Sequence, residues 1–425
     1  MQSTESQDYD VLVIGGGPAG STCATLLADQ GHRVLVLERA RFPRHHIGES
    51  LMPQTYWTLK RLGVLEAMGK SACPRKESVQ FVSSSGRESQ PFFFTDRDPN
   101  EWSITWQVRR DEFDAMLLNN SRTHGADVLE GVGVRDVIFD GRRAVGVRST
   151  ANGSVKEYSA KVVVDASGMS AVLSRQLDLR YPDEFLRSAS IYAYYRGGKR
   201  DTGRNAGATI IVHTPDRRGW FWFIPLADDM TSVGVVGPSS HLCTGRGDSP
   251  DVTLDEELAA CPAAAARLQG AERVGRTYVT SDFSYRSRRV AGDGWVLIGD
   301  AFGFLDPIYS SGVMLALKSG EMAADTIHAG LEAGDVSAKR LGRFGPELAQ
   351  GVQRLRQLIY AFYDRDFSFA AFTRDHPDET DRLVRVLIGD VFTDEVDPLF
   401  RLLGEQVKLP PPIELETDTG ELCEN

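Results

Sequence analysis

Residues 9–20 read YDVLVIGGGPAG, and this stretch decides the fold. The apolar run from Tyr9 to Ile14 is typical of a parallel strand that is buried on both faces. The glycines after it open a segment with helical character that extends to about Gln30, and a second apolar run at 33–37 ends at Glu38. The pattern predicts a strand–helix–strand unit of a doubly wound α/β domain.

The glycines in this unit have spacings that a bound dinucleotide requires. Gly15 permits the tight turn, Gly17 lets the backbone approach a pyrophosphate, and Gly20 lets the helix pack closely on the strand. Glu38 ends the second strand, where it can accept hydrogen bonds from ribose hydroxyls and would repel a 2′-phosphate. The unit therefore predicts a dinucleotide site, although it does not by itself separate FAD from NAD.

A second feature lies far downstream. The apolar run 294–298 (GWVLI) leads into Gly299 and Asp300, and a segment with helical character follows Gly312 and extends to Ile327. An acid at a strand end followed by a glycine-led helix can hold a sugar–phosphate chain and direct backbone N–H groups at an anion, although an ordinary strand–turn–helix is the simpler alternative. Because no second GxGxxG follows a strand, no site for a nicotinamide reductant is visible.

The bulk composition limits the function classes. The net charge of −11 over 425 residues argues against a nucleic-acid partner. The N-terminus resembles no signal peptide, no apolar run is long enough for a membrane span, and five scattered cysteines suit a reducing compartment, so we expect a cytoplasmic protein. The eight histidines show no HxH or HExxH spacing, and no metal is assigned.

Residues 219–225 (GWFWFIP) place two of the six tryptophans, Trp220 and Trp222, on one side of a short segment. A half-buried strand that ends at Pro225 explains this spacing without any functional role.

Several motifs together resemble FAD enzymes of the p-hydroxybenzoate hydroxylase superfamily. These are GGGPAGS at 15–21, HHIGES at 45–50, VVVDASG at 162–168 and IGDAFGFLDPIYSSGV at 298–313. Within that superfamily, WFWFIP at 220–225 is similar to the WxWxIP signature of flavin-dependent halogenases, and the resemblance covers roughly residues 8 to 400. In that family the two tryptophans separate the flavin from the substrate, so that the substrate is not hydroxylated.

The resemblance implies a split architecture. We expect a discontinuous FAD-binding domain from 1–80, 105–180 and 280–340, and an inserted β-rich substrate domain from 81–104 and 181–279. Residues 341–425 are expected to form a helical C-terminal cap, with an extended acidic tail from Leu409. Aromatic-rich helical patterns at 358–372 either line the substrate pocket or simply pack against other helices.

The resemblance also implies roles for individual residues. Lys76, Trp220 and Trp222 are expected to be catalytic, and halide is expected near Ser310, Ser311 and Gly312. Arg110 matches a flavin-contacting arginine, with a surface charge at a helix start as the alternative. The residues expected to bind the flavin are Gly15, Gly17, Ala19, Gly20, Glu38, Arg39, Glu49, Ser50, Arg110, Gly299, Asp300, Pro307, Gly312 and Val313.

Lys76 is assigned by the resemblance alone. The surrounding PRKE suggests a solvated charge cluster, and Lys70 is a nearby competitor, so local sequence would place both lysines on the surface.

The implied reactants are reduced FAD (FADH2), O2 and chloride or bromide, which react through a flavin hydroperoxide to hypohalous acid. The implied substrate is an electron-rich phenol or pyrrole, free or tethered to a carrier protein. Free tryptophan is not expected, because the tryptophan-halogenating branch has a glutamate where Tyr309 stands here. A separate NAD(P)H-dependent flavin reductase is expected to supply reduced flavin. The alternatives are a flavin monooxygenase, a polyprenyl reductase and a flavin-binding carrier or sensor.

Overall fold

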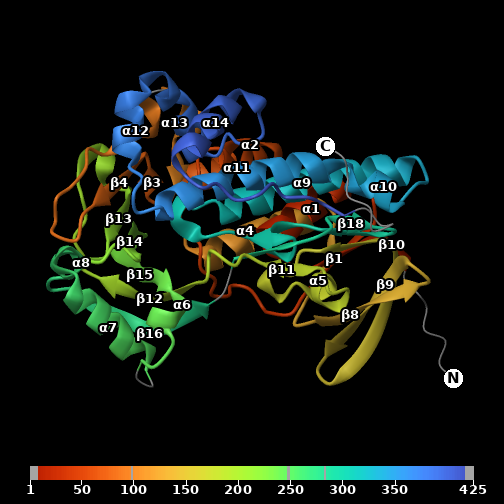
Figure 1. The fold of residues 1–425 in the computed structure, drawn as a ribbon. Coiled ribbons are helices and arrows are strands. Elements are labelled where there is room, and N and C mark those ends of the chain that lie inside the picture. The colour runs from red at the N-terminus through yellow and green to blue at the C-terminus, as the bar shows by residue number, and fades with distance from the viewer. Residues whose placement is uncertain (1–7, 97–98, 247–248, 282–283, 417–425) are drawn as a thin grey trace.

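The computed structural model describes residues 8–96, 99–246, 249–281 and 284–416 (Figure 1). Its larger sheet has the strand order β18-β19-β10-β1-β2-β7. β1 (Asp8–Ile14) lies between β10 (Ser154–Asp165) and β2 (Val34–Glu38), and all three run parallel. Helix α1 (Pro18–Asp29) connects β1 to β2. The strand–helix–strand unit is therefore confirmed with bounds within one or two residues of the prediction.

The other strands of this sheet come from distant parts of the chain. β7 (Asp127–Glu130) extends one edge, while β19 (Trp295–Leu297) and β18 (Ala291–Gly292) extend the other. β8 (Gly133–Asp140) and β9 (Arg143–Ala151) pair antiparallel with the first half of β10 as a ribbon that projects from the body at the lower right of Figure 1.

Two helices pack on α1: α4 (Arg110–Thr123) and α9 (Gly312–Glu332). The expected end of α9 at Ile327 is wrong, because the helix continues for five more residues and stops before Gly334, which has a φ of +64°. The prediction followed the apolar periodicity, which fades after Ile327. The helix itself ends where Gly334 can adopt the left-handed conformation that lets the backbone leave it.

The second sheet has the order β16-β12-β15-β14-β13-β4-β5. Its central strand β14 (Trp220–Pro225) carries the tryptophan pair and is buried throughout rather than half-buried. Trp220 and Trp222 face the main core, while Phe221 and Phe223 face a second core that α7 (Pro250–Ala260) and α8 (Pro262–Arg267) cover. The remaining strands are β4 (Ser78–Val82), β5 (Phe92–Phe93), β12 (Ser188–Arg196), β13 (Thr209–His213), β15 (Met230–Pro238) and β16 (Glu272–Ser281).

The segment after α9 is helical. It comprises α10 (Ala338–Leu341), α11 (Gly345–Tyr363), α12 (Phe369–Asp375), α13 (Thr380–Ile388) and α14 (Asp397–Gln406). The aromatic pattern at 358–372 is thus interrupted between α11 and α12. Residues 409–416 run without regular structure along α11, where Arg356 Nη1 donates to the carbonyl of Pro411 at 2.9 Å. Residues 1–7 and the rest of the acidic tail lie outside the described residues.

The fold class is confirmed as mixed α/β, with a doubly wound sheet and an inserted sheet-rich part. Several smaller elements complete the chain. Among the described residues, no helix combines the length and hydrophobicity needed to cross a membrane. The smaller elements are α2 (Thr55–Arg61), α3 (Leu65–Lys70), β3 (Arg75–Lys76), β6 (Thr105–Trp106), α5 (Val172–Gln176), β11 (Arg180–Pro182), α6 (Ser239–Leu242), β17 (Tyr285–Ser287) and β20 (Gly303–Phe304).

The position of Trp222 depends on Gly234, its partner across β14 and β15. A Cβ at Gly234 would lie 2.4 Å from the Trp222 indole and 2.5 Å from Tyr192 Cβ. We predict that Gly234→Ala displaces the indole and lowers the free energy of unfolding by about 1–3 kcal/mol. Urea unfolding followed by tryptophan fluorescence measures both effects. Gly237→Ala on the same strand is the control, because its Cβ would meet Leu242 at an ordinary 3.5 Å; equal stability of the two variants would contradict the prediction.

Candidate active site

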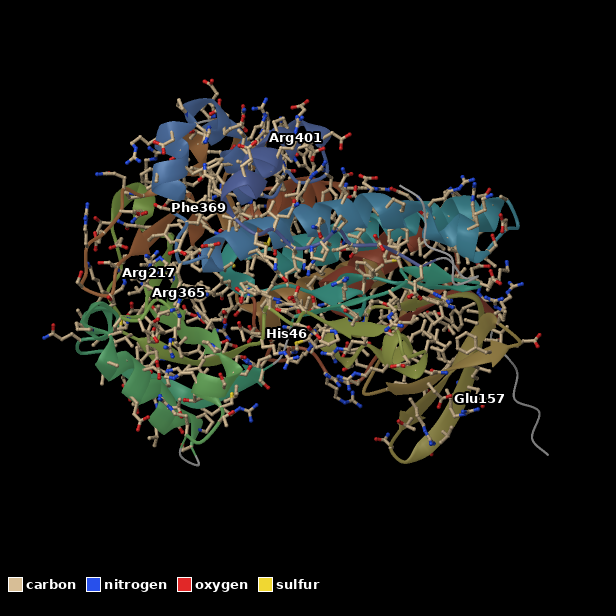
Figure 2. All side chains as sticks on the ribbon, in the orientation of Figure 1. His46, Glu157, Arg217, Arg365, Phe369 and Arg401 are labelled. Atoms are coloured by element: carbon tan, nitrogen blue, oxygen red, sulfur yellow. The ribbon has the colours of Figure 1, made fainter. Side chains whose placement is uncertain are left out.

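A cavity of about 1030 Å³ lies between the two sheets. Its wall includes the glycine turn, Glu38, the tryptophan pair and the start of α9. Figure 2 shows His46, which lines this cavity, between the sheet-rich part and the large sheet. The predicted residues on its wall are Gly15, Gly17, Ala19, Glu38, Arg39, Glu49, Ser50, Arg110, Trp220, Trp222, Asp300, Pro307, Ser310, Ser311, Gly312 and Val313.

The glycine turn leaves the N-terminus of α1 open to the cavity. Gly15 has a φ of +100°, and a Cβ at Gly20 would lie only 2.0 Å from the Gly15 carbonyl oxygen, so α1 can start this close to β1 only with glycine there. No described side chain caps the helix at Gly17. The uncapped N–H groups and the lack of a side chain at Gly17 fit the pyrophosphate of a dinucleotide. Gly20 itself lies behind the cavity wall.

Glu38 is held in place by the backbone of the same turn. Its Oε2 accepts from the N–H of Gly16 at 2.8 Å and its Oε1 from the N–H of Ala40 at 2.7 Å. Each carboxylate oxygen keeps a second lone pair, so the side chain can also accept from ribose hydroxyls. The exposed Arg39 stands on the cavity wall beside it.

Arg110 is buried at the first position of α4, so the alternative of a surface charge is wrong. Its guanidinium forms a bidentate ion pair with Asp114, with N···O distances of 2.7 and 3.0 Å. Its Nη1 also donates to the carbonyl of Ile47 at 2.6 Å. Arg110 therefore fixes the loop that leads to Glu49 and Ser50, and it brings a positive charge to the cavity wall.

Three buried carboxyl groups surround the cavity with raised pKa values. Burial raises the pKa of Glu49 to about 7, although the hydroxyl of Tyr194 donates to it at 2.6 Å. Burial raises the pKa of Asp300 to about 6 against the charge of Arg110. Burial likewise raises the pKa of Asp306 to about 7. Burial thus moves these pKa values toward neutral pH, so that Glu49 and Asp306 are only partly ionised at pH 7.

The indole N–H group of each tryptophan donates a hydrogen bond that fixes its ring. Trp220 Nε1 donates to the hydroxyl of Tyr363 at 3.0 Å, and that hydroxyl donates to Asp306 Oδ2 at 2.8 Å. Trp222 Nε1 donates to Ser232 Oγ at 3.1 Å, and the two indole centroids lie 6.0 Å apart. The rings form a rigid apolar wall.

Asp306 and Tyr363 were missed by sequence reasoning. Asp306 precedes Pro307 and caps the short helix η6 (Pro307–Tyr309) by accepting from the N–H of Ile308, so an acid before proline was a usable signal. Tyr363 is one aromatic among many on α11, and its pairing with Trp220 spans 143 residues. No local pattern reveals such a contact.

The expected halide residues form the start of α9. Ser310 adopts the left-handed region with a φ of +58°, and the buried Ser311 precedes the first residue of the helix. No described side chain caps this helix and its first turn contains no acid. Free N–H groups and the positive end of the helix dipole therefore face the cavity, which suits an anion. Gly299 lies behind the wall, where a Cβ would come within 3.0 Å of Ala19 Cβ.

Lys76 is not on the cavity wall but lies one hydrogen bond behind it. Its Nζ donates to Ser50 Oγ and to the carbonyl of Leu51, both at 2.9 Å, and its side chain is 2 % exposed. Burial lowers its pKa to about 7. Lys70 is exposed and forms an ion pair with Glu66 on α3. The local expectation of a surface lysine is therefore wrong for Lys76 and correct for Lys70.

The fold and this site define a dinucleotide-dependent enzyme whose cavity is bordered by an uncapped helix start and a pair of tryptophans. The model of the tryptophan halogenase family matches residues 10–95 and 92–401. The chain belongs to this family and is a flavin-dependent halogenase.

Individual relatives cover nearly the whole chain. A 1H-pyrrole-2-carbonyl-[peptidyl-carrier protein] brominase of Pseudoalteromonas luteoviolacea is 34 % identical, with 92 % of this chain and 94 % of the relative covered. The corresponding chlorinase of Pseudomonas fluorescens is 33 % identical, over 91 % and 90 %. The solved structure of the flavin-dependent brominase Bmp2 superposes with a TM-score of 0.84 at 34 % identity, over 94 % and 99 %.

We predict that the burial of Lys76 makes stability depend on pH. Because the unfolded chain keeps the Lys76 proton up to about pH 10.5 while the folded protein releases it near pH 7, the unfolded state binds more protons in between. The free energy of unfolding should therefore rise with pH by up to about 1.4 kcal/mol per pH unit in this window. Urea unfolding at pH 7, 8 and 9 should show that Lys76→Met lacks this rise and that Lys70→Met keeps it. Parallel profiles for wild type and Lys76→Met would refute the shifted pKa.

Proposed function

We propose that the chain uses reduced FAD, O2 and chloride or bromide to halogenate a phenol or pyrrole, with a carrier-bound pyrrole as the first candidate. The observation that carries this proposal is the cavity itself. It extends from the cradle at Gly17 and Glu38 to the tryptophan wall, where Ser50 accepts from the buried Lys76. The relatives named for pyrrole-2-carbonyl groups on peptidyl carrier proteins support the substrate class.

The flavin fits the residues at one end of the cavity. The open N-terminus of α1 would hold its pyrophosphate, Glu38 its ribose, and Arg110 with the 47–50 loop the ring end. When bound, reduced FAD would supply two of the four electrons that reduce O2, and the halide supplies the other two as it is oxidised to hypohalous acid.

The chain's own residues then separate and direct the reactants. The N–H groups at Ser311 and Gly312 would hold the halide at the start of α9. Trp220 and Trp222 fill the space through which an aromatic ring would approach the flavin, and their hydrogen bonds to Tyr363 and Ser232 prevent them from turning aside. Hypohalous acid is small enough to pass where the substrate ring is excluded.

Lys76 is suited to receive the halogen. With a pKa of about 7, the Lys76 side chain is a neutral amine in a large fraction of the molecules at neutral pH. A neutral amine takes the halogen from hypohalous acid, forming an N–halogen bond and releasing water. The halogen then passes to the aromatic ring in exchange for a ring proton, and Lys76 is regenerated. The Ser50 hydroxyl, which joins the cavity to Nζ, positions this exchange.

Two further features concern substrate and partner. Tyr309 is buried, and its hydroxyl donates to the carbonyl of Leu358 at 3.4 Å, so no carboxylate stands at this position to act on free tryptophan. The sequence carries one dinucleotide motif, which supports a separate NAD(P)H-dependent flavin reductase as the source of reduced flavin.

The proposed function is tested with FAD, a flavin reductase, NADH, and chloride or bromide. The substrate panel contains three free compounds, which are pyrrole-2-carboxylate, phenol and tryptophan. It also contains a carrier protein loaded with a pyrrole-2-carbonyl group. Mass spectrometry should find halogenated pyrrole on the carrier and no halogenated tryptophan, and omission of the reductase should abolish turnover. Rapid anaerobic reduction of the flavin by NADPH alone, or hydroxylated instead of halogenated product, would contradict the proposal.

A second experiment tests Lys76. Lys76→Ala should bind FAD and oxidise reduced flavin normally but lose nearly all halogenated product, because no amine remains behind Ser50. Lys76→Arg should fail as well, since a guanidinium stays protonated and does not form the N–halogen bond. Halogenated product is measured per reduced flavin oxidised.

Lys70→Ala is the matched control and should keep full activity, because Lys70 is exposed. Equal product yields from wild type and Lys76→Ala would remove Lys76 from the mechanism.

A further inference from the structure

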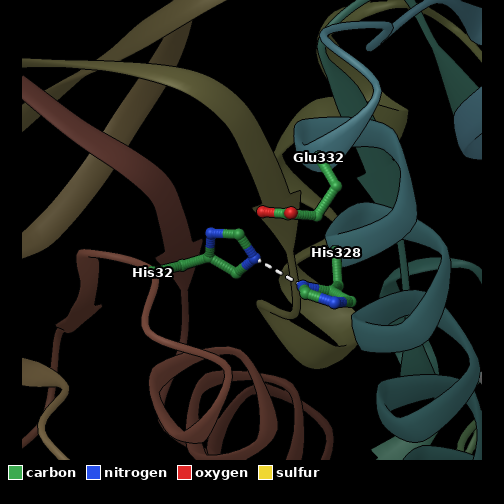
Figure 3. Close-up of side chains that lie close together, drawn as sticks. All are labelled: His32, His328 and Glu332. Carbon is green, nitrogen blue, oxygen red and sulfur yellow. Dashed lines mark hydrogen bonds between the residues drawn. The ribbon is translucent and has the colours of Figure 1, made fainter.

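Two histidines and a glutamate meet at the end of α9 that is remote from the cavity. His328 and Glu332 are one turn apart on α9, and His32 lies in the turn between α1 and β2 (Figure 3). His328 follows Gly312 by sixteen residues, which is about 24 Å along the helix axis. None of the three residues lines the cavity of the halogenation site.

The geometry of the three side chains is close to that of a metal site. His32 Nε2 and His328 Nδ1 lie 2.9 Å apart, and one ligand atom of each of the three residues lies within 4.8 Å of the others. Two imidazole nitrogens on a tetrahedral zinc ion, with Zn–N bonds of about 2.0–2.1 Å, are separated by about 3.3 Å. The rings need to part by only a few tenths of an ångström for an ion to replace the shared proton. Figure 3 shows the Glu332 carboxylate beside the gap between the rings.

We propose that His32, His328 and Glu332 bind a divalent transition-metal ion, with Zn²⁺ as the best match. Two imidazoles and one carboxylate are the ligands of zinc and its neighbours in the first transition row, whereas Mg²⁺ and Ca²⁺ prefer oxygen ligands alone. The three protein ligands leave a fourth position open to solvent, since His32 and His328 are partly exposed and Glu332 is exposed.

The charges around the group favour a cation. Asp10 and Glu332 both act on His32 as negative charges. Lys161 opposes them, but its ammonium is 2.8 Å from Asp10 Oδ1, so that these two charges largely offset each other and Glu332 supplies the net negative charge. An ion bound here would join the turn after α1 to the end of α9, the two helices whose N-termini border the cavity. It stabilises the arrangement of these helices and takes no part in the halogenation chemistry.

The test uses the full-length protein, stripped with EDTA, dialysed and titrated with ZnCl2 by calorimetry. We expect one site per chain and a rise in the melting temperature, because an ion that binds only the folded state stabilises it. With CoCl2 the same site should give the visible absorption of a tetrahedral or five-coordinate ion. Glu332→Gln and His328→Ala should each weaken zinc binding by at least about tenfold, since each removes one of three ligands.

Glu332→Gln keeps the shape of an exposed side chain and so keeps the fold intact. His241→Ala is the matched control, because His241 also pairs with a glutamate, Glu257, but has no third ligand residue beside it in the part of the chain that the structure describes. It should leave zinc binding and the melting-temperature shift unchanged. The proposal is overturned if wild type binds zinc no better than the Glu332→Gln and His328→Ala variants, or if His241→Ala abolishes binding.

Discussion

The close approach of α1 to β1 is the constraint on which the rest of the structure depends. A Cβ at Gly20 would lie 2.0 Å from the carbonyl oxygen of Gly15, so only glycine fits at this position. With glycine there, α1 can start at the edge of the sheet. That position directs the uncapped N–H groups of α1 into the cavity. β1, on which α1 packs, also pairs with β2, which ends at Glu38, and with β10.

The same constraint is repeated where α9 packs on α1. A Cβ at Gly320 would lie 2.6 Å from the carbonyl oxygen of Ala19, so the two helices cross almost backbone to backbone. This packing brings the start of α9, with Ser310 and Ser311, to the same cavity as the glycine turn although the two segments are almost 300 residues apart. The starts of α1 and α9 therefore both border one cavity.

Desolvation gives this space its chemistry. Lys76 has a lowered pKa, and Glu49, Asp300 and Asp306 have raised pKa values, and in each case burial is the largest cause. All four shifts reduce the charge of the site at neutral pH. Such an arrangement costs stability, and perturbed pKa values that gather around one cavity are typical of active sites. The hydrogen-bonded line from Trp220 through Tyr363 to Asp306 shows that the helical C-terminal segment takes part in shaping it.

The sequence by itself determined the features that depend on neighbours along the chain. Glycine spacing, apolar runs and the WFWFIP signature were sufficient for the strand–helix–strand unit, the downstream strand and helix after residue 294 and the family, because turns and short strands are encoded locally. The division of the chain into the expected domains stays a prediction, as do the roles of the individual site residues.

Only the tertiary structure decided which polar groups are buried and which distant segments meet. Lys76 and Lys70 look alike in the sequence, yet one is enclosed behind Ser50 and the other lies in solvent. The pairing of Trp220 with Tyr363 and of His32 with His328 likewise depends on how helices pack, since their separations of 143 and 296 residues exceed the range of any sequence periodicity. Burial is a property of the whole packed molecule, and a pKa follows burial.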